Sequence, residues 1–189
     1  TDNNTRAAVV QTGEAQFAFP VPFEQAAVLS KNDKLDVVDH KNSIMARYLS
    51  MNTQQKPFDN VKVREAINYA INKEALAKVA FSGYATIVDG VVPQGVDFAH
   101  KTGPWPYDIK KAKALLAEAG YPNGFELTLS STNDRYVNDG QVAQAVAQYL
   151  ARVGIKTNVD AMTASIYFPK RAKREFSFSM GGWPAETGE

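Results

Sequence analysis

The chain has 189 residues, 44% hydrophobic and 22% charged, which is typical of a globular protein able to bury a core. Its 21 basic and 20 acidic residues give a net charge of +1, which does not favour a nucleic-acid partner. Cysteine is absent, which excludes disulfides, thiolate metal sites and cysteine nucleophiles, and no apolar run approaches the roughly 18 residues of a membrane span.

The first part of the chain predicts short elements. Asn4 can cap a helix that runs to Thr12, and Pro22 opens a second, shorter helix. Alternating apolar residues predict strands at 15–19, 35–38 and 44–51.

A polar stretch at 52–57, which ends in a proline, separates this part from three amphipathic helices. Their predicted N-caps are residues whose side chains can accept a hydrogen bond from the first turn: Asp59, Asn72 and Asp108. Residues 84–107, between the second and third helices, are rich in proline and glycine and predict loops.

The last third of the chain alternates strands with helices. Strands are expected at 125–131, 155–159 and 176–180, and helices from Asn138 or Asp139 to Val153 and at 164–174. This alternation predicts an α/β fold in which the helices starting near residues 59, 108 and 138 pack on one sheet that holds all three strands.

Charged and aromatic side chains follow two of these three strands. Arg135 and Tyr136 come after the first strand, and Trp183 and Glu186 come after the third. Ligands of open α/β sheets bind beyond the carboxyl ends of the strands. A cation and an anion at neighbouring strand ends would suit a zwitterion such as a small peptide, while a solvated loop arginine fits the same pattern.

No catalytic or cofactor-binding motif is present. The chain has two histidines, far apart, and contains no G-x-S-x-G, P-loop, G-x-G-x-x-G or H-E-x-x-H sequence. We therefore expect a binding protein and not an enzyme, without a metal or a cofactor.

Four segments carry patterns that are more specific than periodicity. The longest is PFDNVKVREAINYAINK at 57–73, followed by YDIKKAKALLAEAGY at 107–121, and shorter ones lie at 4–15 and 148–156. Together they resemble the peptide/nickel (family 5) solute-binding proteins of ABC importers, and the matching segments are spread over nearly the whole chain.

The resemblance implies a fold and a domain organisation. The α/β lobe would be of the type II periplasmic-binding-protein kind, as a fragment of a bilobed cluster C protein. Residues 1–50 would be a late segment of the first lobe and residues 51–189 most of the second ligand-binding lobe.

The resemblance also implies a function. The chain would be part of an extracytoplasmic receptor that binds a small peptide-like or zwitterionic ligand between two lobes and delivers it to the permease of an ABC importer. It would be periplasmic, or membrane-anchored in a Gram-positive host, and only peripheral to the membrane. An enzyme or a peptide-holding chaperone on a related scaffold is the alternative, and the ligand could be a dipeptide, an oligopeptide, glutathione, an opine, a sugar or a metal chelate.

The family's ligand contacts can be carried over to particular residues. Arg135 occupies the place of an arginine that binds the ligand's carboxylate in dipeptide-type members. Glu186, three residues after Trp183, occupies the place of a carboxylate that receives the ligand's ammonium group. The family often has R-P-Y where this chain has Arg135 directly before Tyr136, and often has aspartate where this chain has Glu186.

Overall fold

The computed structural model describes residues 3–39, 45–88, 90, 92–93, 96, 99–100 and 102–184. Its helices are α1 (Asn3–Thr12), α2 (Phe23–Leu29), α3 (Val61–Ala70), α4 (Lys73–Ala80), α5 (Ile109–Glu118), α6 (Asp139–Ala151) and α7 (Ala164–Ala172). Its strands are β1 (Met45–Met51), β2 (Glu126–Thr132), β3 (Lys156–Met162) and β4 (Phe178–Pro184).

The four strands form one sheet in the order β1-β4-β2-β3. Strand β2 runs parallel to β3 and β4, whereas β1 runs antiparallel to β4. The carboxyl ends of β2, β3 and β4 therefore meet the start of β1 at one end of the sheet, which we call the carboxyl end. The prediction that three strands share one sheet is confirmed.

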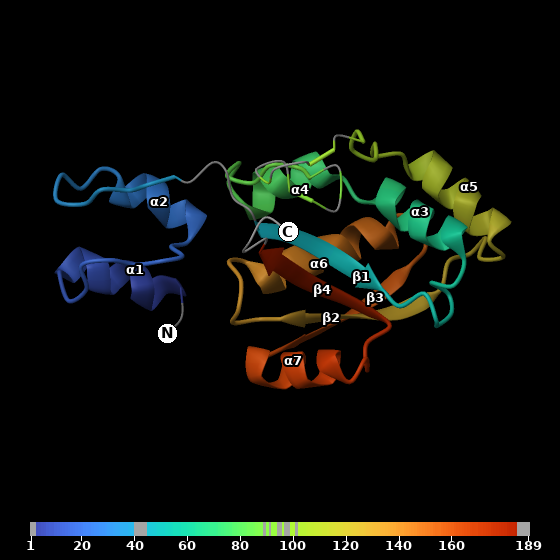
Figure 1. Cartoon of the computed structure of the whole chain (residues 1–189). Coiled ribbons are helices and arrows are strands. Elements are labelled where there is room, and N and C mark those ends of the chain that lie inside the picture. Colours follow the sequence, from blue (N-terminus) through green and yellow to red (C-terminus); the bar gives the residue numbers. More distant parts are fainter. Residues whose placement is uncertain are drawn as a thin grey trace.

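Helices cover both faces of the sheet (Figure 1). Helix α6, together with α3, α4 and α5, lies over one face, and α7 lies over the other. The core between the sheet and the first group consists of apolar side chains that are almost fully buried: Phe58, Val63, Ile67, Leu116, Leu129, Val146, Leu150, Ile155 and Phe178. Burial of each such side chain contributes about 1.5–3 kcal/mol, so this layer holds the helices on the sheet.

Two of the three predicted helix caps are confirmed, and one lies a residue further along the chain. Asn72 accepts a hydrogen bond from the backbone N of Ala75, and Asp108 accepts one from that of Lys111, both at 2.9 Å. Helix α3 is capped by Asn60 instead of Asp59. The backbone N of Asp59 donates to the carbonyl of Gln55, so Asp59 belongs to the preceding turn.

The strands expected at 15–19 and 35–38 are wrong, because neither segment is a strand in the structure. The side chains of Phe17 and Phe19 are 81% and 77% exposed. An alternating pattern becomes a strand only where a second strand pairs with it, and within the described ranges neither segment has such a partner.

The third predicted strand begins two residues later than expected and extends further. β4 continues through Gly181, Gly182 and Trp183 because β1 pairs with it along its whole length, from Met51 opposite Phe178 to Met45 opposite Pro184. Trp183 therefore lies within the strand and does not follow it.

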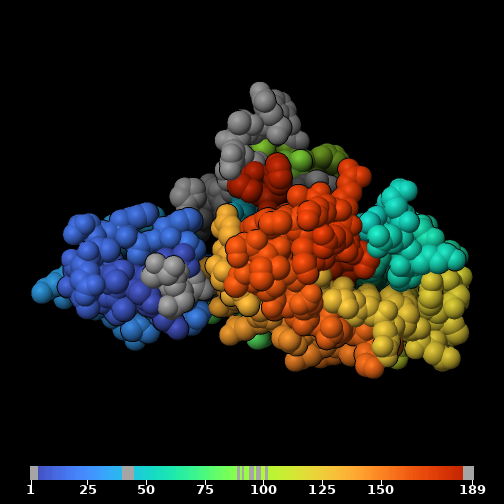
Figure 2. Space-filling model, turned by 90° about the horizontal axis from the view of Figure 1, so that it is seen from below, coloured from blue at the N-terminus to red at the C-terminus, as the bar shows by residue number. Residues whose placement is uncertain are grey.

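Helices α1 and α2 form a separate unit beside the sheet domain (Figures 1 and 2). This unit lies on the side towards which the carboxyl end of the sheet points. The ring of Phe23 in α2 contacts the rings of Phe81 and Tyr84, just after α4, with centroids 5.9 and 5.5 Å apart. Aromatic contacts thus connect the unit to the end of α4.

Candidate ligand-binding site

The predicted site residues that the structure describes gather at the carboxyl end of the sheet. β2 and β4 are neighbours there, so the loop that follows β2 lies next to the last residues of β4. Arg135 and Tyr136 belong to that loop, and Trp183 is the penultimate residue of β4. Glu186 lies outside the described residues.

A buried carboxylate holds the loop after β2 in place. Asp139, the first residue of α6, is only 3% exposed. Its Oδ2 accepts hydrogen bonds from the hydroxyl of Thr132 at 2.7 Å and from the backbone N of Tyr136 and Arg135 at 3.2 and 3.3 Å. Its Oδ1 accepts from the backbone N of Gly140 at 3.0 Å. Hydrogen bonds to a charged acceptor are among the stronger ones, so the backbone positions of Arg135 and Tyr136 are fixed by α6.

Two further contacts attach this loop to other helices. Asn138 has a left-handed backbone conformation and donates from its side chain to the carbonyl of Ala80, at the end of α4, at 2.9 Å. Asp134 accepts from the backbone N of Ala164, the first residue of α7, at 2.7 Å. The loop is therefore fixed to helices on both faces of the sheet. Asn138 does not cap α6 with its side chain.

Tyr136 connects the loop to β4. Its hydroxyl donates to the carbonyl of Gly182 at 3.3 Å and accepts from the backbone N of the same residue at 3.2 Å. A Cβ atom on Gly182 would lie 2.9 Å from Cε1 of the tyrosine ring and 3.2 Å from Cδ of Arg47. Glycine is therefore needed at position 182 for both side chains to lie this close to the strand.

Two arginines lie against the ring of Tyr136. The Cζ atom of Arg47, on β1, is 4.2 Å from the ring centroid, and the Cζ atom of Arg135 is 5.1 Å from it. Arg135 is exposed, whereas Arg47 is partly buried. Such contacts between a cation and an aromatic face are favourable, and here they place two positive charges at the carboxyl end.

The buried head of Arg47 was not predicted from the sequence. Burial lowers its pKa from the ordinary value, and the nearby carboxylate of Asp139 acts in the opposite direction. Arginine stays charged in proteins, so a positive charge is retained in a partly desolvated position. The only signal in the sequence was one charged residue in the middle of a predicted strand.

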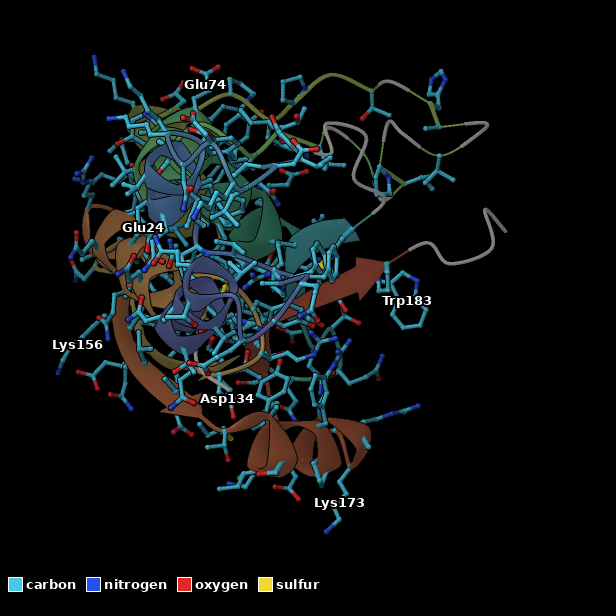
Figure 3. The ribbon with its side chains drawn as sticks, turned by 90° about the vertical axis from the view of Figure 1, so that its left-hand side faces the viewer. Glu24, Glu74, Asp134, Lys156, Lys173 and Trp183 are labelled. Carbon is cyan, nitrogen blue, oxygen red and sulfur yellow. The ribbon has the colours of Figure 1, made fainter. Side chains whose placement is uncertain are left out.

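The indole of Trp183 extends from the end of β4 away from the sheet domain (Figure 3). It is 66% exposed, although tryptophan is usually well buried. A large exposed indole at the end of the sheet offers a flat apolar surface to a ligand or a second domain.

Other kinds of site find little support in the described residues. The described residues include no group of three or more histidine, aspartate or glutamate side chains that could hold a metal ion. No helix among them is long and apolar enough to cross a membrane. An open hollow of about 550 Å³ on α4 is lined by Glu74, Ala77, Lys78, Gly83, Ala85, Thr86, Ile87 and Pro104, and by none of the strand-end residues.

Comparison with curated proteins finds relatives that span the whole chain. The chain is 54% identical over 194 residues to the glutathione-binding protein GsiB of Salmonella choleraesuis, and 55% identical over 193 residues to GsiB of Pectobacterium atrosepticum. Both alignments cover 100% of this chain but only 38% and 37% of the relatives. The chain thus spans somewhat more than a third of their length.

Solved structures share the fold. The periplasmic binding protein DppA of Helicobacter pylori, in complex with the peptide STSA, is 33% identical with a TM-score of 0.93, over 100% of this chain and 36% of that one. AgaA of Agrobacterium tumefaciens R10, in complex with agropinic acid, is 30% identical with a TM-score of 0.81, over 98% of this chain and 38% of that one. These similarities confirm the predicted α/β lobe of the type II periplasmic-binding-protein kind.

The model of the bacterial extracellular solute-binding proteins, family 5 (middle part), matches residues 1–189. Because the match covers the whole chain and the fold agrees with it, the chain belongs to family 5 of the bacterial extracellular solute-binding proteins.

Proposed function

We propose that these residues form part of a two-lobed, non-catalytic receptor that binds a small peptide-like ligand outside the cytoplasmic membrane and delivers it to the permease of an ABC importer. The observation that carries this proposal is the gathering of three residues at the carboxyl end of the sheet: Arg135 and Tyr136, on a loop fixed by Asp139, and Trp183, near the end of the neighbouring strand β4. Family membership supports the class of function.

The sequence predicts two lobes in this chain, with residues 1–50 in the first lobe and 51–189 in the second. Strand β1 (Met45–Met51) pairs with β4 along its whole length and so belongs to the sheet domain, which moves the proposed division from residue 50 to a point before β1. The carboxyl end of the sheet would then face the first lobe across the ligand. The position of α1 and α2 on that side of the sheet supports this orientation.

The proposed ligand is a small peptide with charged ends. Arg135 would bind its carboxylate through two parallel hydrogen bonds, Trp183 would pack against its body, and Glu186 would receive its ammonium group. Closure of the two lobes would exclude water and strengthen both charge interactions. Two similar proteins support this class: one named as glutathione-binding at 54% identity, and one solved with a four-residue peptide.

We propose glutathione, a tripeptide with two carboxylates and one ammonium group, as the first ligand to test. Native mass spectrometry of the intact receptor, purified without denaturation, tests the proposal without assuming the ligand. We expect one peptide-like molecule, of the size of glutathione or a small peptide, for each protein molecule. A sugar or a metal chelate in its place would contradict the proposed ligand class but leave the receptor function standing.

A further inference from the structure

Among the residues that the structure describes, one complete edge of the Arg47 guanidinium group finds no hydrogen-bond partner. Nε and Nη2 are both shielded from solvent, and neither has a partner among the described residues. These two nitrogens lie side by side in arginine, and their N–H bonds point in the same direction. That geometry matches the two oxygens of a carboxylate. Buried donors that stay unpaired cost free energy, so the edge is suited to an acceptor that arrives from elsewhere.

The position of Arg47 places this edge in the candidate site. Arg47 lies directly opposite Gly182 in the sheet and stacks on the ring of Tyr136, as Arg135 also does. Two guanidinium groups therefore share one aromatic ring at the carboxyl end. Within the described part of the chain, neither arginine forms an ion pair.

The nearest buried carboxylate does not serve as the partner. Asp139 contributes to the electrostatic environment of Arg47, but its Oδ2 already accepts from Thr132 and from the backbone of Arg135 and Tyr136. No hydrogen bond joins the two side chains among those described. The site thus contains more positive charge than the described residues neutralise.

We propose that Arg47 binds a second carboxylate of the ligand, so that the receptor selects small peptides with two carboxylates over those with one. This inference rests on the proposed function, in which Arg135 binds the first carboxylate. The edge is covered in this structure, so a carboxylate reaches it after the side chain rotates. Arg47 as a whole residue is only partly buried, so its side chain is not enclosed on every side.

A purely structural role for Arg47 makes a different prediction. Its stem lies close to Gly182 and its head stacks on Tyr136, so its removal could loosen the loop and weaken every ligand equally. A specific role weakens only those ligands that carry the second carboxylate. Arg47→Met separates the two, because methionine keeps much of the stem and removes the charge.

The experiment titrates the intact receptor, as wild type and as Arg47→Met, with three compounds by calorimetry. They are glutathione, glutathione with its glycine carboxylate converted to an amide, and γ-aminobutyryl-cysteinyl-glycine, which lacks the α-carboxylate of the glutamyl residue. We expect Arg47→Met to weaken glutathione binding by about 30-fold or more, the effect of removing one partner of a buried charge pair. The analogue that lacks the carboxylate bound by Arg47 should bind the wild type and Arg47→Met with affinities that differ by no more than about threefold.

Arg152→Met is the matched control, because Arg152 also stacks on a tyrosine, Tyr149, but at an exposed position outside the candidate site. It should change none of the three affinities. Arg47→Lys, which keeps the charge but loses the paired edge, should fall between wild type and Arg47→Met and provides a second variant if methionine impairs folding.

Two results would overturn the inference while leaving the proposed function intact: equal weakening of all three compounds by Arg47→Met, or no change in any of them. If the wild-type receptor binds none of the three, the proposed peptide ligand is wrong, and the inference fails with it.

Discussion

The hydroxyl group of Tyr136 forms hydrogen bonds with both backbone polar groups of one residue, Gly182, at 3.2 and 3.3 Å. The phenol thus satisfies the backbone of β4 at a position beyond the end of its neighbour β2. The loop that carries Arg135 is joined in this way to the strand that carries Trp183. The two strand ends that the sequence marks as a site therefore form one connected surface.

Replacement of Tyr136 by phenylalanine tests this connection. The ring remains, but the backbone N–H and C=O of Gly182 lose their side-chain partner, so we expect a loss of about 1 kcal/mol in the free energy of unfolding. Urea unfolding measures this loss. Tyr107→Phe is the control, because among the described residues its hydroxyl accepts one exposed hydrogen bond, from Arg152. This variant should lose less free energy of unfolding than Tyr136→Phe. An equal cost for both variants would show that the contact with Gly182 contributes little.

Removal of the Asp139 carboxylate should loosen the whole loop. Asp139→Ala leaves the hydroxyl of Thr132 and the backbone N–H groups of Arg135 and Tyr136 without their acceptor, so we expect a loss of about 2 kcal/mol or more. Amide hydrogen exchange at residues 135 and 136 should become faster. Asp134→Ala removes one exposed acceptor and should cost about 1 kcal/mol at most. The interpretation of Asp139 fails if its variant is no less stable than that of Asp134.

Most of the helices and all four strands of the sheet could be predicted from the sequence because their signals are local. Asn72 and Asp108 cap helices through contacts three residues away, and an apolar periodicity identifies each buried face. The segments 15–19 and 35–38 could not be predicted correctly, because an alternating pattern does not reveal whether a partner strand exists. The extension of β4 to Pro184 likewise depends on β1, more than a hundred residues earlier in the chain.

The candidate site was only partly predictable for the same reason. Arg135, Tyr136 and Trp183 follow from the rule that ligands bind at the carboxyl ends of strands. Arg47 lies on an antiparallel strand whose start, not its end, reaches this position. No local pattern places the start of β1 beside the end of β4, so the second cation became visible only in the folded chain.

A close approach of two glycines makes a sharp prediction about stability. A Cβ atom on Gly124 would lie 1.9 Å from the carbonyl oxygen of Gly154, whereas one on Gly120 would meet nothing within 4 Å. Both residues have positive φ angles, of 75° and 91°. Gly120→Ala should therefore cost only the backbone strain, roughly 1 kcal/mol. Gly124→Ala adds an overlap worth about 1–3 kcal/mol more. Thermal unfolding that ranks the two variants equally would contradict this account.

The opposite charges proposed to hold the ligand can be tested separately. In the intact receptor, Arg135→Ala and Glu186→Ala should each weaken ligand binding by roughly 2–5 kcal/mol, because each leaves a ligand charge unpaired in the closed cleft. Arg135→Lys should lose less binding free energy than Arg135→Ala, since lysine keeps the charge without the paired hydrogen bonds. If both alanine variants bind the ligand within about threefold of wild type, the ends of the ligand are held by other residues.

The central claim is that the ligand is enclosed between two lobes, of which these 189 residues supply mainly one. Calorimetric titration of glutathione into the intact receptor and into the isolated 189-residue chain, side by side, tests it most directly. We predict one saturable site in the intact receptor. The isolated chain should bind glutathione more weakly, by a factor on the order of 100 or more, because one wall buries much less of the ligand than a closed cleft does. Equal affinity of the two proteins would contradict the two-lobe account.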